Sequence, residues 1–254
     1  MRSLRAYFIL VTLLTIPVWI LGLAVDLELL PGLPIGAVAV ICPALAAGIL
    51  SYREGGWKSV LALLSRLLDF GRAKWWLLAI ALVNPLLFDL AFLVARGFLN
   101  PVPDPEISIT HALVLLALFL PAAALEEIGW TGFAFDRLRT RFGLLSSGLL
   151  LGLFWALWHF PTLIAAGRAP GWIVWWTVWT VSARLIMVTA YDWAGRSLFA
   201  MVLYHAMSNL CWQLYPVNGS FFDPQISGML TAFAALCLLA AAYSKRHVSA
   251  PRQP

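Results

Sequence analysis

The chain has 254 residues, of which 62% are hydrophobic and only 11% are charged, and its formal net charge is +5. Soluble domains carry about 25% charged residues, so this composition, with a mean hydropathy of +0.86, excludes a water-soluble globular protein. The positive charge is better explained by membrane topology and anionic lipid than by binding to nucleic acid.

Apolar stretches of 18 or more residues recur along the chain, and such stretches predict transmembrane helices. We therefore expect an all-α polytopic membrane protein, a single transmembrane domain over residues 1–254. About eight transmembrane helices are expected, at residues 7–25, 33–51, 75–96, 109–136, 145–166, 171–191, 197–214 and 225–243. The first apolar run is longer than a typical signal-peptide core, so we expect an uncleaved helix there.

The basic residues predict the orientation of these helices, because cytoplasmic loops retain an excess of Lys and Arg. With a cytoplasmic N-terminus, 14 of the 17 Lys and Arg residues fall on the cytoplasmic side, Arg252 near the C-terminus among them. Two fall on the opposite side, and Arg184 lies inside the sixth span. We therefore expect both termini to be cytoplasmic. In the long cytoplasmic connection 52–74, apolar residues at helical spacing predict an amphipathic helix in the headgroup plane.

Two adjacent carboxylates, Glu126 and Glu127 in the stretch LEEIGWTGF, interrupt the fourth apolar run. At about 1.5 Å per helical residue, Glu126 lies roughly 16 Å from the cytoplasmic marker Arg137. The same count places His159 roughly 19 Å and His205 roughly 14 Å deep. Residues 109–166 form a hairpin that turns near Gly143, which sets His159 opposite Glu126.

Asn209 follows His205 by four residues and therefore shares its helical face. The sequence thus predicts an intramembrane cluster of two carboxylates, two imidazoles and one amide, and ionisable groups at such depth are functional candidates. Each member alone has a simpler reading: an interfacial glutamate pair, a hydrogen-bonded core histidine, or an asparagine that joins two helices.

Three segments carry a resemblance to a known family: LEEIGWTGFAFDRL, FWALWHFP and LYHAMSNL. They resemble the motifs of the CAAX protease and bacteriocin-processing (CPBP, or Abi) family of intramembrane proteases, relatives of the endopeptidase that trims prenylated CAAX proteins. The family pattern is Glu-Glu-x-x-x-Arg, Phe-x-x-x-His and His-x-x-x-Asn/Asp, and its order and spacing match residues 110–215. The resemblance implies a CAAX-protease-like catalytic core over 110–215.

The chain departs from the family pattern at two positions. Trp155 stands where the family has phenylalanine, and Thr131 stands where it has arginine. The first change keeps an aromatic ring, whereas the second removes a cation beside the carboxylates. Arg184 on the sixth span is a candidate replacement, and the sequence does not show whether it reaches the site.

The resemblance implies an intramembrane endopeptidase whose catalytic residues are Glu126, Glu127, His159, His205 and Asn209. We expect Glu126 to act as the general base on water and Glu127 to orient it or share its proton. His159 then holds the water, and His205 and Asn209 donate to the oxyanion.

The cofactor is left open between two versions of this chemistry. A metal-free glutamate mechanism is preferred, because the H-E-x-x-H helix of soluble zinc proteases is absent from the sequence. In the alternative, Glu126, His159 and His205 ligate zinc and leave a fourth position for water.

Two other functions stay open: a catalytically inactive membrane scaffold or immunity protein of the same family, and an ion- or proton-coupled transporter. Transporters commonly show internal repeats, and we find none in the sequence. The expected partners are a membrane-tethered peptide or lipidated protein tail and the lipid bilayer itself. The expected location is a prokaryotic plasma (inner) membrane, crossed several times.

Overall fold

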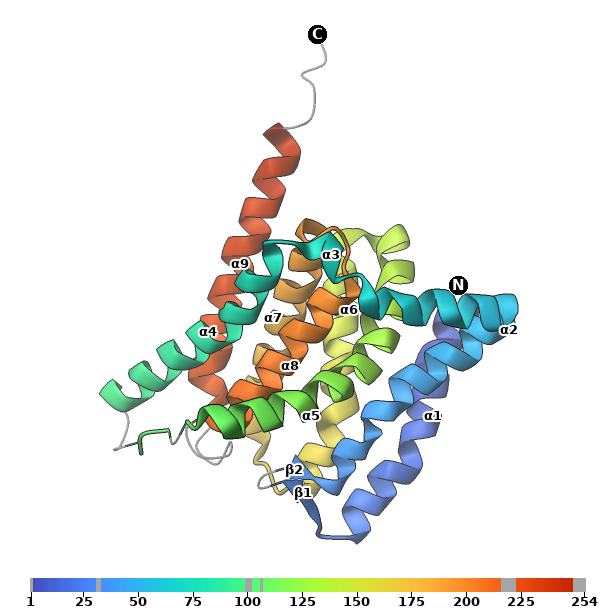
Figure 1. The fold of residues 1–254 in the computed structure, drawn as a ribbon. Helices are drawn as coiled ribbons and strands as arrows, with labels where there is room; N and C mark the ends of the chain where they lie inside the picture. The colour runs from blue at the N-terminus through green and yellow to red at the C-terminus, as the bar shows by residue number, and fades with distance from the viewer. Residues whose placement is uncertain (1, 31–32, 99–101, 106, 216–222, 249–254) are drawn as a thin grey trace.

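The computed structural model describes residues 2–30, 33–98, 102–105, 107–215 and 223–248 (Figure 1). In these ranges the helices are α1 (Arg2–Ala24), η1 (Ile35–Val40), α2 (Ile41–Ser65), η2 (Arg66–Leu68), α3 (Phe70–Ala73), α4 (Trp76–Phe98), α5 (Ile109–Glu127), η3 (Ile128–Phe135), α6 (Asp136–Ala165), α7 (Pro170–Trp193), α8 (Leu198–Leu214) and α9 (Pro224–Val248). Two short antiparallel strands, β1 (Glu28–Leu30) and β2 (Leu33–Pro34), join α1 to η1. Arg252 lies outside the described residues.

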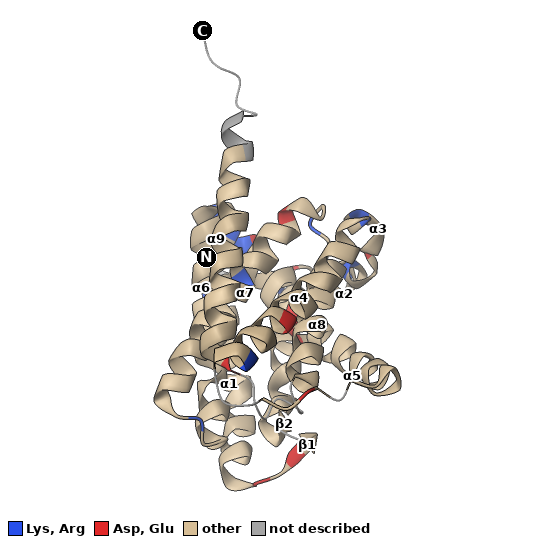
Figure 2. Ribbon diagram, turned by 90° about the vertical axis from the view of Figure 1, so that its left-hand side faces the viewer, with Lys and Arg blue, Asp and Glu red and all other residues tan. Residues whose placement is uncertain are grey.

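The all-α membrane fold is confirmed. In the described ranges, six helical runs are long and apolar enough to cross a membrane. One of them is the continuous run Ile109–Ala165, which covers two of the predicted spans, and α8 with its 17 residues lies outside these six. The number of about eight spans and the cytoplasmic position of both termini stay predictions. Figure 2 shows that Lys, Arg, Asp and Glu colour only short stretches of the ribbon.

Helix α7 is the most enclosed of the long helices. In its apolar window 72% of the residues are buried, against 17% in α1, and α7 packs on both α6 and α9. Helix α8 packs against α4 and α5. Large apolar side chains at the outer surface, such as Ile20, Leu86 and Phe233, suit contact with acyl chains rather than water. Polar groups on α7 and α8 are thereby kept inside the protein.

Two glycine breaks shape the chain around the site. Gly143 has φ +73°, which glycine adopts without steric penalty, and it interrupts the long run where the hairpin turn is predicted. Gly56 (φ +64°) breaks α2 in the same way. The part of α2 after this break runs across the ends of the neighbouring helices toward α3 (Figure 1). Its position in the headgroup plane stays a prediction.

The segment after this break is fastened to the helices that carry the candidate site. The guanidinium of Arg66 donates to the carbonyl of Gly132 at 3.0 Å and pairs with Asp136 at 2.9 Å. The carboxylate of Asp69 accepts from the hydroxyl of Ser197 (2.8 Å) and from the first backbone N–H groups of α8 (3.0 and 3.1 Å). The segment therefore holds η3 and the start of α8 together at one end of the bundle.

Candidate active site

Glu126 and Glu127 are the last two residues of α5, immediately before the π-helix η3. Their exposed fractions are 3% and 0%. π-Helical turns occur frequently at functional sites. The turn begins at Ile128, and its second residue is Gly129, where an added Cβ would lie 2.5 Å from the carbonyl oxygen of Pro43. A glycine is therefore required for η3 to pack this closely against α2.

Two indoles hold the Glu126 carboxylate. Trp130 Nε1 and Trp155 Nε1 both donate to Oε2 of Glu126, each at 3.0 Å. Its other oxygen, Oε1, lies 3.8 Å from Nε2 of His205, which is too long for a direct hydrogen bond. Oε1 of Glu126 and Nε2 of His205 can therefore each bind a third group.

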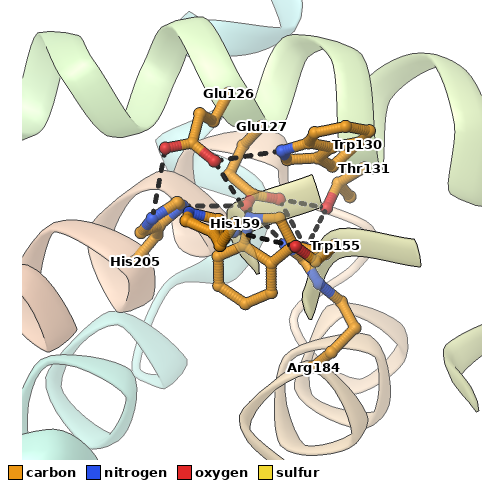
Figure 3. Close-up of polar contacts among 8 residues, drawn as sticks. All are labelled: Glu126, Glu127, Trp130, Thr131, Trp155, His159, Arg184 and His205. Carbon is orange, nitrogen blue, oxygen red and sulfur yellow. Dashed lines mark hydrogen bonds and ion pairs between the residues drawn. The ribbon is translucent and has the colours of Figure 1, made fainter. Parts of the chain in front are cut away.

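Glu127 is bound by charged and polar partners on every side. Nη1 and Nη2 of Arg184 donate to its two oxygens at 2.8 and 3.0 Å, and the hydroxyl of Thr131 donates to Oε2. Nδ1 of His205 lies 2.9 Å from Oε1. Figure 3 shows Glu127 between His205 and Arg184. A buried ion pair is tolerated when further hydrogen bonds satisfy the two groups. Thr131 and His205 supply them to Glu127, whereas Nε of Arg184 has no hydrogen-bond partner in the described part of the chain.

The imidazole of His205 therefore spans the two glutamates, with one ring nitrogen toward each. Adjacent helical residues point about 100° apart, and a ring with nitrogens on opposite sides suits that divergence. His205 has an exposed fraction of only 3% and contacts the ring of Trp155, with ring centroids 5.1 Å apart.

His159 lies beside this cluster without a hydrogen bond to either glutamate in the described part of the chain. Its Nδ1 is 2.8 Å from the carbonyl oxygen of Trp155. Its ring packs among the indoles of Trp155, Trp158 and Trp176, with centroids 5.6, 4.8 and 5.2 Å away. The hydrogen bond at Nδ1 sets the rotation of the ring.

The structure thus brings four of the five predicted residues together, and it joins the fifth, Asn209, to them by no hydrogen bond within the described residues. Asn209 lies one turn after His205 on α8 and is partly buried. Glu126, Glu127, His159 and His205 are gathered in one cluster (Figure 3).

Sequence reasoning missed several partners of the cluster. Trp130 and Thr131 follow Glu126 and Glu127 by four residues, and this helical spacing is a signal that could have found them. Trp155 was read only as an aromatic replacement, whereas its indole N–H is a ligand of Glu126. Arg184 does reach the site, a question that the sequence left open.

The side chains do not form a metal centre. Among the described residues, no group of three or more His, Cys, Asp and Glu side chains is arranged to hold a metal ion. Glu126, His159 and His205, the zinc ligands of the alternative mechanism, are not arranged as such a group. Nδ1 of His205 is bonded to Glu127 and Nδ1 of His159 to the backbone, so only Nε2 of each ring remains for a further partner.

Together, the fold and the site define a helical membrane protein that buries an acid, imidazole and guanidinium cluster between its helices. Comparison with known proteins shows which family part of the chain is similar to. Residues 108–211 match the family model described as type II CAAX prenyl endopeptidase Rce1-like, which confirms the resemblance carried by the three motifs.

A curated relative is also similar to the chain. A CAAX prenyl protease 2 of Methanococcus maripaludis is 31% identical over 140 residues, which are 51% of this chain and 51% of that protein. The match therefore spans about half the length of the relative.

Proposed function

We propose that this protein is an intramembrane endopeptidase that hydrolyses a peptide bond of a membrane-associated or lipidated, CAAX-like substrate. Its family match and its relative's name support this reaction class. The observation that carries the proposal is the position of Glu126. Its carboxylate is buried, oriented by two indoles, and left with one oxygen directed at an imidazole nitrogen that has no direct bond to it.

In the proposed reaction Glu126 takes a proton from a water molecule, and the water oxygen attacks the carbonyl carbon of the substrate. The negative charge moves to the carbonyl oxygen. When the intermediate collapses, the C–N bond breaks and the proton held by Glu126 passes to the leaving nitrogen. The products are a carboxylate and an amine, and no co-reactant beyond water is needed. General base catalysis of this kind contributes about 10²- to 10⁴-fold in rate.

The remaining side chains serve the oxyanion and the water. His205 and Asn209 donate to the carbonyl oxygen as charge develops, a role worth about 10²- to 10³-fold per donor. Because Glu127 is ion-paired with Arg184, it accepts from Nδ1 of His205, so Nε2 donates only when the ring carries both protons. His159 orients the water. A catalytic core over 110–215, within a single domain of residues 1–254, remains part of the proposal.

We infer that the substrate is a membrane-tethered peptide or lipidated protein tail that enters from the cytoplasmic leaflet. The depth of roughly 14–19 Å expected for the cluster suits a tail that is already held at the membrane surface. The host membrane in this proposal is a prokaryotic plasma membrane. Whether the tail must be prenylated is decided by the assay below.

The test is a cleavage assay with purified protein in lipid nanodiscs. Quenched fluorescent peptides ending in a CAAX-like tail are supplied in farnesylated, geranylgeranylated, acylated and unlipidated forms. We expect cleavage of at least one lipidated form, and a loss of at least about 100-fold in kcat for Glu126→Gln and about 100-fold for His205→Ala. Thr177→Val, which removes a hydroxyl bonded only to its own helix, serves as the matched control.

Metal analysis and incubation with chelators accompany the assay. In the proposed mechanism, cleavage is unchanged after a strong chelator and the purified protein carries no stoichiometric metal. A fully folded wild-type protein that cleaves none of the peptides would contradict the proposal and favour a scaffold. Ion or solute flux that is lost in Glu126→Gln would favour a transporter.

A further inference from the structure

We propose that Arg184 is the positioning residue of this site. From α7 it fixes Glu127 as the acceptor for His205, and it holds Trp155 in place as the donor to Glu126. The kinetic part of this inference rests on the proposed peptidase function, whereas its structural part is measured without any substrate.

The first step is the ion pair with Glu127. Arg184 and Glu127 both have exposed fractions of 0%, and two nitrogens of the guanidinium face two oxygens of the carboxylate. Such a bidentate pair fixes orientation as well as charge. Both oxygens of Glu127 are occupied, so this carboxylate is not free to act on water. The two adjacent glutamates therefore have different roles: Glu127 orients its neighbours, and Glu126 reacts.

The second step runs from Glu127 to His205. Since Glu127 is held as a carboxylate by a guanidinium, it accepts a hydrogen bond, and Nδ1 of His205 at 2.9 Å must donate. The partner of one imidazole nitrogen decides which nitrogen carries the proton of the neutral ring. Arg184 thereby determines, through Glu127, that Nδ1 carries the proton of the neutral His205 ring. The nitrogen without a direct hydrogen bond is then Nε2, which faces Glu126.

The third step runs from Arg184 to Trp155. The guanidinium carbon lies 4.2 Å from the centroid of the Trp155 ring, within the range of a cation–π contact. The same indole donates to Glu126 at 3.0 Å. The guanidinium of Arg184 therefore contacts Trp155, which donates to Glu126, and also pairs with both carboxylate oxygens of Glu127.

Thr131 supplies a way to separate this role from general packing. Its hydroxyl is 3.4 Å from Nη1 of Arg184 and donates to the same oxygen of Glu127. A cationic side chain placed at position 131 therefore reaches the Glu127 carboxylate from α5's own continuation, η3. If Arg184 acts by placing a cation there, Thr131→Arg will compensate for its removal.

The substrate-free experiment uses NMR of protein labelled with ¹⁵N at histidine, of which the chain has four. We expect Nδ1 of His205 to give the signal of a protonated, hydrogen-bonded nitrogen, assigned by its loss in His205→Gln. Arg184→Met is expected to shift or broaden this signal. Thr131→Arg in the Arg184→Met background is expected to restore it. An unchanged His205 signal in Arg184→Met would overturn the proposal.

The kinetic experiment uses the same variants and the lipidated peptide. Arg184→Met is expected to lower kcat about 100-fold with little change in KM, because misplacement of the reacting groups by about 1 Å has that effect. The kcat of Arg184→Lys is expected to lie between those of the wild type and Arg184→Met, since a single ammonium neither pairs bidentately nor stacks on an indole plane. Thr131→Arg should recover about tenfold of the loss in Arg184→Met.

A matched control removes a different arginine–carboxylate pair of α7, one that joins it to α6 rather than to α5. Arg139 on α6 binds Asp192 on α7 through both carboxylate oxygens, with side-chain exposures of 17% and 15%. Arg139→Met is expected to leave kcat within about twofold and the His205 signal unchanged.

Thermal unfolding in the nanodisc distinguishes positioning from stability. Arg184→Met leaves a buried carboxylate unpaired and is expected to lower the melting temperature by about 10 °C. The double variant Arg184→Met/Glu127→Gln should regain most of that stability and none of the activity. Recovery of both would overturn the positioning role. If the wild-type protein cleaves nothing, the proposed function fails, and the His205 signal alone decides this inference.

Discussion

The packing of η3 against α2 gives a prediction for Gly129→Ala. The sign of the change in stability shows whether helix propensity or steric overlap decides the outcome. In an ordinary helix, Gly→Ala stabilises a protein by about 0.5–1 kcal/mol. At Gly129, however, the added Cβ would lie 2.4 Å from the hydroxyl of Tyr7, 2.5 Å from the carbonyl oxygen of Pro43 and 2.6 Å from its Cβ. Real Cβ atoms do not approach neighbours this closely, and Pro43 cannot move without moving α2.

Overpacking of this kind costs about 1–3 kcal/mol, and we expect Gly129→Ala at the upper end because backbone atoms are involved. One kcal/mol lowers the melting temperature of a chain of 150–250 residues by about 2–4 °C. After the gain in helix propensity, Gly129→Ala should therefore unfold about 5–10 °C below the wild type. It should also lose cleavage, because η3 directly follows Glu126 and Glu127.

The assay is thermal unfolding and peptide cleavage of the purified variants in nanodiscs. The control is Gly48→Ala on α2, where an added Cβ would have nothing within 4 Å, and it should leave the melting temperature equal or up to about 2 °C higher. The reasoning is refuted if Gly129→Ala unfolds at the wild-type temperature and cleaves at the wild-type rate.

Three further predictions concern side chains that hold others by hydrogen bonds. Thr15→Val removes the acceptor for the indole N–H of Trp158, which lies at 2.9 Å; an unsatisfied buried donor costs about 1–3 kcal/mol, so thermal unfolding should begin earlier. Asp69→Ala removes the acceptor for the first two backbone N–H groups of α8 and leaves the cap by Ser197 in place; it should cost about 1 kcal/mol, with faster hydrogen exchange confined to the first turn of α8. Trp130→Phe removes one of two donors to Glu126 and leaves space beside a fully buried ring, so it should lower kcat about tenfold and also lower the melting temperature.

The helical architecture was predictable because a membrane leaves the backbone few choices. A chain in hydrocarbon must satisfy each N–H and C=O internally, so long apolar runs have to be helices. The predicted runs at 75–96 and 171–191 correspond to α4 (Trp76–Phe98) and α7 (Pro170–Trp193). The β1–β2 pair and the break at Gly55–Gly56 were not predicted. Each lies at the edge of an apolar run, where the helical spacing predicts a helix on one side and does not show where the chain bends.

The meeting of Glu126 with His205 was predictable for a different reason. Counting residues from charged markers fixes depth, and buried ionisable groups at one depth tend to find each other because each is costly alone. Depth does not fix rotation about a helix axis. The reach of Arg184 depends on the rotation of α7, which is set by its close packing against α6 at Gly152, where an added Cβ would lie 3.2 Å from both the Cβ of Arg184 and the Cα of Val181.

The π-helix η3 directly after Glu127 could not be predicted from the sequence. Backbone bonding changes from i→i+4 to i→i+5 in such a turn, so the residues of η3 (Ile128–Phe135) are rotated from the positions that an α-helix would give them. Thr131, which the motif comparison treats as a lost cation, follows Glu127 by four residues, donates its hydroxyl to that carboxylate and lies 3.4 Å from Nη1 of Arg184. The cation that the motif lacks at Thr131 is thus supplied by Arg184 from another helix, α7. A comparison limited to the motif cannot detect this replacement, because Arg184 lies outside the motif.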